Sequence, residues 1–324
     1  MVFLLACELQ VETNAQTKAG KARFYPDLIV SEIQQIKVAQ QGIEPLVTLV
    51  LKDARWQLLS PANLPANPAL MNALMDSLQN ATILEQKTAE SDWYKHLGVD
   101  DISSAKARGT LLVLEAGEDS IELIIGDKSR NQQGQYWRAA NSPNQAVMRV
   151  DQVLDLPREA IGWMDREIID LPANGVASVS IESSDGSHYF LQRNSHEEDL
   201  SLGAGKSEGE SDVKQLPHSV NQLVFGLTRL NFDAVESLAN ITHGPAEYTL
   251  TFGLFDGTAI KLSLFPDENG SWASLMAIND SQALNTVLVE TMNQHLSSYH
   301  YHLSTQRTAL YIQAIKSLAG EHDE

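Results

Sequence analysis

The stretch Trp56-Gln57-Leu58-Leu59-Ser60-Pro61 and the helical pattern that follows Pro65 decide the fold of this chain. Trp56 and Leu58 alternate as on a short strand, and the two prolines end its pairing. Asn67 is suited to cap a helix, and Pro68 stands at the first helical position, where no N–H is needed. Apolar residues then recur at the spacing of a helix: Leu70, Met71, Leu74, Met75, Leu78 and Ile83.

A weaker copy of the same pattern begins at Leu216-Pro217. Apolar residues stand at equal distances from Pro65 and from Pro217, so we predict a second helix over residues 219–238 with the same buried stripe. The matching positions are Met71 with Leu223, Met75 with Leu227, Leu78 with Leu230, and Ile83 with Val235.

Alternating, β-rich segments flank both helical patterns and predict antiparallel hairpins. A further helix is predicted over 151–164, interrupted by Pro157, and two more over 281–296 and 305–318. The predicted strands are 33–38, 46–51, 56–58, 110–115, 121–125, 136–138 and 147–150 in the first half, and 176–181, 189–191, 248–252, 260–264, 272–278 and 299–303 in the second half.

These elements predict an α+β fold of two tandem similar units, each an antiparallel sheet of hairpins packed with helices. Residues 1–23 are expected to form an N-terminal tether, residues 24–167 the first unit, and residues 168–324 the second. An acidic, Gly/Ser-rich loop over 196–214 takes the place of the tryptophan strand in the second unit. Two copies indicate an internal duplication, since a solenoid needs at least about three repeats.

The composition excludes some classes of partner. The 23 basic and 42 acidic residues give a net charge of −19, the opposite of the basic surface that binds a phosphate backbone. We therefore expect no nucleic-acid partner and no electrostatic attachment to anionic lipid. The single cysteine, Cys7, allows no internal disulfide and no cysteine-based metal site.

Cys7 is a candidate lipidation site. The segment Leu4-Leu5-Ala6-Cys7 resembles a bacterial lipobox, whose cysteine receives lipid after signal cleavage. Only six residues precede Cys7, whereas a secretory signal has about 15–30. Two interpretations stay open: the true start lies upstream of Met1, or the apolar beginning is a coincidence. Since no other stretch approaches the about 18 apolar residues that span a bilayer, membrane contact is expected only through an N-terminal anchor.

One glycine-rich motif resembles a phosphate-binding loop, and one pair of histidines resembles a metal site, but both are better explained without a ligand. Gly203-Ala204-Gly205-Lys206-Ser207 lacks the earlier glycine of a phosphate-binding loop, because Leu200 stands there, and carboxylates follow it instead of a helix. His300 and His302 lie on one face of a predicted strand, not far from His295, and could share a metal. We interpret that face as solvated, with Tyr299, Tyr301 and Leu303 buried on the other.

The carboxylates show no catalytic pattern. Glu197-Glu198-Asp199 lies in the acidic loop and indicates a solvated spacer, since acid–base catalysis needs carboxylates held apart with divergent pKa values. Asp165-Arg166 is interpreted as a salt-bridged joint between the two units rather than an interaction element. We therefore predict no catalytic residue, no metal and no cofactor.

Aromatic residues supply the remaining candidate site. Four of the five tryptophans lie in the first unit, and exposed aromatic side chains favour protein interfaces. The competing interpretation is that these side chains pack in the core and at its rim. The candidate interaction surface is Trp56, Trp93, Tyr94, Trp137 and Arg138.

The order of several short motifs carries a family resemblance. They are Trp56 to Pro61, Leu64-Pro65-Ala66-Asn67, His96-Leu97-Gly98-Val99, Ile125-Gly126-Asp127, Tyr136-Trp137-Arg138 and Met164 to Ile169. In this order they resemble the bacterial family known as domain of unknown function 4340, from Phe24 to Leu318. The resemblance implies an envelope protein with one N-terminal membrane helix, often found beside gliding-type ABC transporter components, with no established activity. This sequence departs from that pattern in its short apolar start and its acidic loop.

Two functional hypotheses follow. The first is a non-catalytic protein at the periplasmic face of the inner membrane, an accessory component of an ABC-transporter-like complex that binds a protein partner. The alternative is a module that binds or hydrolyses envelope polymer, carbohydrate or peptidoglycan. Its support is the aromatic content near Trp56 and Trp93 and the histidines around His300. A deep pocket with those aromatics and two facing carboxylates would favour the alternative.

Overall fold

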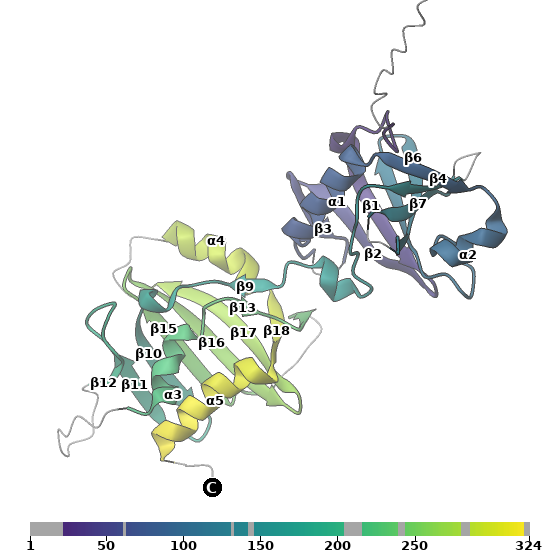
Figure 1. Cartoon of the computed structure of the whole chain (residues 1–324). Coiled ribbons are helices and arrows are strands. Elements are labelled where there is room, and N and C mark those ends of the chain that lie inside the picture. The colour runs from purple at the N-terminus through teal and green to yellow at the C-terminus, as the bar shows by residue number, and fades with distance from the viewer. Residues whose placement is uncertain are drawn as a thin grey trace, which may run out of the picture. The chain divides into compact units, whose positions relative to one another are not determined.

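Two eight-stranded sheets organise the chain (Figure 1). The computed structural model describes residues 22–60, 63–130, 133–141, 146–203, 216–238, 244–279 and 286–320. Every strand pair whose register is described is antiparallel. The predicted mixed fold with antiparallel sheets is therefore confirmed, and the structure contains few helices. In this part of the chain, no helix combines the length and apolar composition that crossing a bilayer requires.

The first sheet has the strand order β3-β2-β1-β5-β6-β7-β8-β4. Its helical segments are η1 (Val30–Glu32), α1 (Pro68–Asn80), η2 (Ser91–Trp93) and α2 (Tyr94–Leu97). Its strands are β1 (Ile33–Gln40), β2 (Ile43–Lys52), β3 (Arg55–Leu58), β4 (Ile83–Thr88), β5 (Thr110–Ala116), β6 (Asp119–Lys128), β7 (Gln135–Ala139) and β8 (Val147–Val150).

The second sheet has the order β12-β11-β10-β15-β16-β17-β18-β14. Its strands are β10 (Val176–Ser183), β11 (His188–Gln192), β12 (Ser201–Leu202), β14 (Ala234–Ser237), β15 (Tyr248–Leu254), β16 (Thr258–Asp267), β17 (Gly270–Asn279) and β18 (Tyr299–Ser304). The remaining elements are η3 (Ala160–Trp163), β9 (Glu167–Ile169), η4 (Ala173–Gly175), α3 (His218–Asn221), η5 (Gln222–Phe225), β13 (Leu230–Asn231), α4 (Thr286–Leu296) and α5 (Thr305–Ala319).

The two strand orders are the same when each sheet is counted from its own first strand. With β10 taken as the first strand and β13 left out, both sheets run 3-2-1-5-6-7-8-4. In each, the fourth strand lies at the edge beside the eighth, although it precedes the fifth along the chain. Strand β13 pairs instead with β9, as a separate two-stranded sheet.

Local signals place helices α1 and α5 as expected. The Asn67 side chain accepts a hydrogen bond from the Leu70 N–H (3.1 Å), so α1 has the predicted cap followed by Pro68. At the start of α5, the Ser304 hydroxyl accepts from the Arg307 N–H (3.2 Å). Helix α5 ends at Ala319, and the following Gly320 has a positive φ of 79°, which suits the left-handed turn after a helix.

The predicted helix over 219–238 is wrong. Only α3 and η5 are helical there, and the chain continues as β13 and β14. Leu78 is buried within α1, whereas Leu230 is buried in β13 opposite Ile169, so these two positions are not equivalent. The backbone at Arg229 has a positive φ of 44°, in the left-handed region, so a right-handed helix cannot continue through this position.

Three further predictions need correction. The helix expected over 151–164 is absent apart from η3, because the residues before Pro157 are held by side chains of the first sheet rather than by their own helical bonds. Ile83 begins β4 instead of ending α1. The acidic loop contains β12, which pairs with β11 at the sheet edge; residues 204–215 lie outside the described part.

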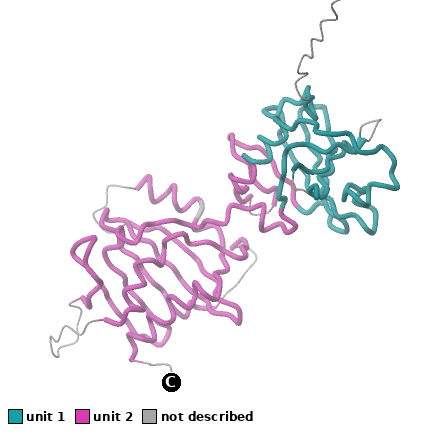
Figure 2. Tube along the Cα trace, in the orientation of Figure 1, with its two compact units in different colours: residues 1–46, 72–156 teal, residues 47–71, 157–324 magenta. Residues whose placement is uncertain are grey.

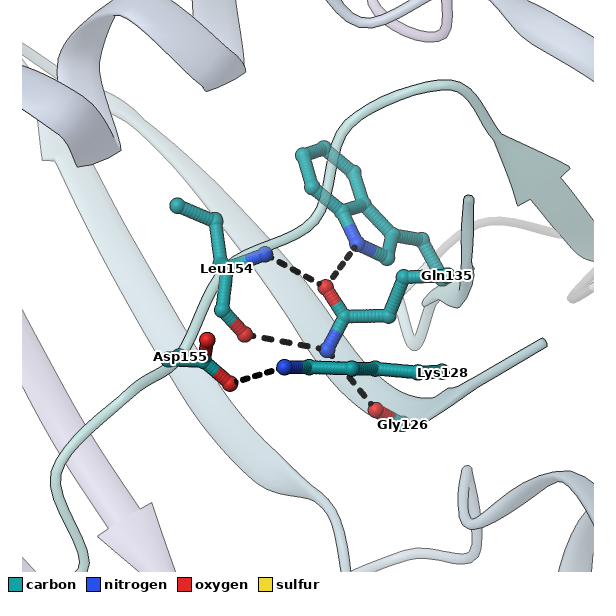
Figure 3. Close-up of polar contacts among 6 residues, drawn as sticks. Gly126, Lys128, Gln135, Leu154 and Asp155 are labelled. Atoms are coloured by element: carbon teal, nitrogen blue, oxygen red, sulfur yellow. Dashed lines mark hydrogen bonds and ion pairs between the residues drawn. The ribbon is translucent and has the colours of Figure 1, made fainter. Parts of the chain in front are cut away.

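Gln135 holds the segment after β8 against the first sheet (Figure 3). Its amide nitrogen donates to the carbonyl oxygens of Gly126 (3.0 Å) and Leu154 (3.1 Å). Its carbonyl oxygen accepts from the Leu154 N–H (2.8 Å) and the Trp137 indole N–H (3.4 Å). Beside it, Lys128 and Asp155 form an ion pair of 2.5 Å. This buried side chain thus satisfies backbone groups that a helix would otherwise pair.

The backbone contacts divide the chain into two compact units that each combine separate segments (Figure 2). One contains residues 1–46 and 72–156, and the other contains 47–71 and 157–324. Within the latter, Asn67 N–H donates to the Trp163 carbonyl (2.9 Å), and Asp165 N–H donates to the Pro65 carbonyl (2.9 Å). The sequence-based division into 24–167 and 168–324 stays a prediction.

Replacing Gln135 should destabilise the first sheet. In a Gln135→Ala variant, the buried N–H groups of Leu154 and Trp137 lose their acceptor, at a cost of about 2–3 kcal/mol. We expect a lower urea midpoint and faster hydrogen exchange at the Leu154 amide. The control is Gln34→Ala, an exposed position on β1, with a change within about 0.5 kcal/mol. Equal stability of the two variants would contradict this role.

Candidate interaction surfaces

Of the five residues predicted to form an interaction surface, some are exposed and the others lie in the core. Trp93 is 55% exposed and Trp56 is partly exposed. Tyr94, Trp137 and Arg138 are buried, which corrects the prediction that all five form one surface. Trp137 and Arg138 are consecutive in β7 and point to opposite faces of the sheet. Both are buried because both faces are covered at this strand.

Arg138 is a buried cation held by a hydrogen bond, an ion pair and a ring contact. Its Nε donates to the Val99 carbonyl (2.9 Å), and its terminal nitrogen pairs with the Asp101 carboxylate. The guanidinium lies over the Tyr94 ring, 4.5 Å from the centroid. A buried charge is tolerated when it is paired and hydrogen-bonded, so Arg138 fixes the segment 94–101 on the sheet. Its role is structural.

Glycines allow this segment to approach β6 closely. A Cβ at Gly126 would lie 2.5 Å from the Leu97 carbonyl oxygen, and a Cβ at Gly98 would lie 2.6 Å from the Asp127 carboxylate. Gly98 also has a positive φ of 70°. Three motifs that are separate in the sequence, 96–99, 125–127 and 136–138, therefore meet at one packing point in the first sheet.

Trp93 borders an open hollow beside this packing point. The hollow has a volume of about 310 Å³, and its other lining residues are Lys87, Thr88, Glu90 and Leu97. Trp93 ends η2, and its ring contacts the His96 ring at a centroid distance of 5.5 Å. Lys87 pairs with Glu85 at 2.8 Å. The arrangement presents a large aromatic ring to solvent, with polar groups around it.

Each sheet has an inward face, on which its longer helices pack, and an outward face on the opposite side. The outward faces of the two sheets differ in polarity. In the first sheet, the outward residues Leu111, Val113 and Ile124 form an apolar cluster with Tyr94 and Val99. In the second sheet, α3, η5, α4 and α5 all contribute to the cluster on the inward face. The outward positions there include Thr249, Thr251, Ser263 and Ser274, which alternate with buried residues and are partly exposed.

A second hollow lies at one end of this outward face. It has a volume of about 260 Å³ and is lined by residues that include Phe265, Trp272, Glu247 and Asp267. Phe265 and Trp272 are cross-strand partners, and Trp272 is in turn opposite His302. The sequence shows Trp272 only as one aromatic on a strand. The pairing register that brings these residues together is not visible in it.

Asp267 is held in an ionised state by its neighbours. The backbone N–H of Asn269 donates to its carboxylate (2.9 Å), and His302 Nε2 lies 3.2 Å from the other oxygen. The Asn269 hydrogen bond is the largest cause that lowers the pKa of Asp267 below its usual value; burial opposes it, and the His302 interaction adds to the lowering. The hollow therefore contains a carboxylate group at neutral pH.

The histidines are not arranged as predicted. His300 is 7% exposed and packs against the Phe265 ring at 5.7 Å, so the expectation of a solvated His300 is wrong. His302 pairs with Asp267 and its ring contacts Trp272 at 5.2 Å. Among the described residues, no three His, Cys, Asp or Glu side chains come together as a metal site would need. The His295 side chain and Cys7 lie outside the description.

The remaining sequence candidates have local partners. Arg166 donates to the Phe232 carbonyl (2.8 Å) and pairs with Asp233 (2.5 Å), so it anchors the β9–β13 pairing. The Glu198 carboxylate accepts from the Asn194 N–H (3.2 Å). In the motif 203–207, only Gly203 is described, and its N–H donates to the Phe190 carbonyl (2.9 Å).

Comparison with known proteins identifies one similarity. A family model described as a domain of unknown function (DUF4340) matches residues 56–251, which is more than half of the chain. Searches of curated proteins and of solved structures gave no match. The matched range includes all three motifs that meet at Arg138.

Substitutions at Arg138 and Trp93 should change the free energy of unfolding by different amounts, because Arg138 lies in the core and Trp93 lies at the surface. Arg138→Leu leaves the Val99 carbonyl without its donor and should lower the free energy of unfolding by about 2–4 kcal/mol. Trp93→Ala should change it by no more than about 0.5 kcal/mol, because the ring is largely exposed. Urea denaturation measures both. A large loss of stability in Trp93→Ala would show that the ring is part of the core.

Proposed function

We propose that this chain, which belongs to the DUF4340 family of unknown function, is a non-catalytic cell-envelope protein that binds a membrane-protein partner. In this proposal it is an accessory component of an ABC-transporter-like complex at the periplasmic face of the inner membrane. An N-terminal anchor, a lipid on Cys7 or a membrane helix, tethers it there. The compartment rests on the resemblance of the motif order and on the lipobox-like start.

We also infer that the two sheets arose by duplication of one α+β unit. The support is their common strand order, in which the fourth strand crosses to the edge beside the eighth. The edge position of β12 corresponds to that of the tryptophan-containing β3. In this proposal the second copy has shortened that edge and lost the segment that covers the outward face of the first.

The exposure of Trp93 is the observation that carries the proposed binding role. Aromatic residues that fill a partner's pocket contribute a large share of the binding energy at protein interfaces. Trp93 presents more than half of its surface to solvent beside an open hollow. Its neighbour Tyr94 packs under Arg138, so the backbone of this segment is held rigidly. A pre-positioned ring loses little conformational freedom on binding.

The chemistry of the hollow supports binding over hydrolysis. Its ionisable lining side chains are Lys87 and Glu90, whereas glycoside hydrolysis commonly uses two carboxylates that flank the bond. Binding of an envelope polymer is the second candidate, because an exposed tryptophan ring also offers a stacking surface for sugar rings. The two candidates share the Trp93 surface and differ in what contacts it.

Site-specific crosslinking in cells tests the proposal. A photoreactive phenylalanine analogue at position 93 should crosslink to a transmembrane or ATP-binding component of a transporter, identified by mass spectrometry. The control is position 29, where Ile29 is 54% exposed. Trp93→Ala should reduce co-purification of the same component by at least about tenfold, as for an interface hot spot. Equal crosslinking at both positions, or attachment to glycan alone, would overturn the transporter role.

A further inference from the structure

We propose that the hollow around Trp272 binds a cationic side chain, arginine or lysine, from a partner polypeptide. This site is separate from the Trp93 surface and does not depend on the function proposed for it. It lies on the outward face of the second sheet, where β16, β17 and β18 present Phe265, Trp272 and His302 at consecutive cross-strand positions.

The aromatic rings form one wall of the site. Trp272 and His302 pack edge to face at 5.2 Å, and Phe265 and His300 do so at 5.7 Å. These contacts hold the Trp272 ring in place while the hollow beside it stays open. A cation gains electrostatic attraction over the face of a tryptophan ring within about 6 Å of its centroid.

Two carboxylates supply the opposing charge. Within the described part of the chain, no hydrogen bond or ion pair engages the side chain of Glu247. Asp267 is engaged by Asn269 and His302, yet its second oxygen keeps further acceptor capacity. A guanidinium or ammonium group in the hollow can therefore contact the ring and donate charge-assisted hydrogen bonds to the carboxylates of Glu247 and Asp267.

Charge complementarity favours a basic side chain as the group that binds in the hollow. The chain carries a net charge of −19, and such a field attracts a basic partner segment and repels an acidic one. Lys261 also lies on the outward face, opposite Met276, but it is not part of the lining of the hollow. The hollow, about 260 Å³, is small enough to select a single side chain rather than a folded surface.

The open sheet face gives an extended segment access to the hollow. The cross-strand row Thr249–Ser263–Ser274 lies two residues from Phe265 and Trp272 along β16 and β17. Hydroxyl groups on this row can hydrogen-bond to the backbone of a bound peptide. The cationic side chain of the peptide thus determines binding specificity, whereas the hydroxyl row contacts only the peptide backbone and accepts peptides of different sequence.

Peptide titration of the full chain tests this site. The probes are a short acetylated and amidated Gly-Arg-Gly peptide and the same peptide with citrulline, a neutral analogue of arginine. The arginine peptide should shift the Trp272 indole N–H resonance in NMR spectra, and its affinity should fall as salt rises. The citrulline peptide should bind at least about fivefold more weakly, since it lacks the charge that the ring and the carboxylates attract.

Variants of the lining residues, with a matched control, test whether the arginine peptide binds in the hollow. Glu247→Gln should weaken binding of the arginine peptide by about threefold, as for an exposed ion pair, and Trp272→Leu by about fivefold or more. Glu290→Gln on the exposed side of α4 is the control and should change nothing. Because Glu247 is exposed, its variant should fold normally. Equal binding of both peptides, an unchanged affinity in Glu247→Gln, or shifts produced only by oligosaccharides would overturn the proposal.

Discussion

A sheet whose helices pack on one face must either cover its other face or make that face compatible with water. Every second residue of a strand points to that face, so the choice involves all the strands at once. The first sheet covers it with the segment 94–102, over Leu111, Val113 and Ile124. The second sheet carries several threonine and serine residues among the outward positions of β15, β16 and β17. This difference sets where each half of the chain can bind a partner.

Covering the first sheet has a consequence for its polar residues. Arg138 points to the covered face and would be a buried charge without the Val99 carbonyl, Asp101 and the Tyr94 ring. Gln135 plays a similar part for the segment that follows β8. The polar groups that look available in the sequence are thus used to hold loops on the sheet. The same loop presents Trp93 to solvent.

The sequence predicts hairpins well and long-range arrangements poorly. Strands β5, β6, β15 and β16 alternate clearly and are joined by short turns, so they were predictable from neighbours alone. The second helix was mispredicted because the apolar spacing after Pro217 suits several structures. Arg307 and Tyr311 of α5 donate to the carbonyls of Thr228 and Gly226, which a longer helix would use for its own hydrogen bonds. The Trp272 hollow could not be predicted, since it depends on the register of three strands separated along the chain.

The sequence by itself determined the antiparallel hairpins, the Asn67 helix cap, the acidic net charge and the motif order that marks the family. These features depend on residues close together in the chain, where spacing and local hydrogen bonds are sufficient. The tertiary structure decided which aromatic residues are buried, which face of each sheet is covered, and where carboxylates meet rings. Those outcomes depend on contacts between distant segments, and burial of one side chain is fixed only when the segment that covers it is in place.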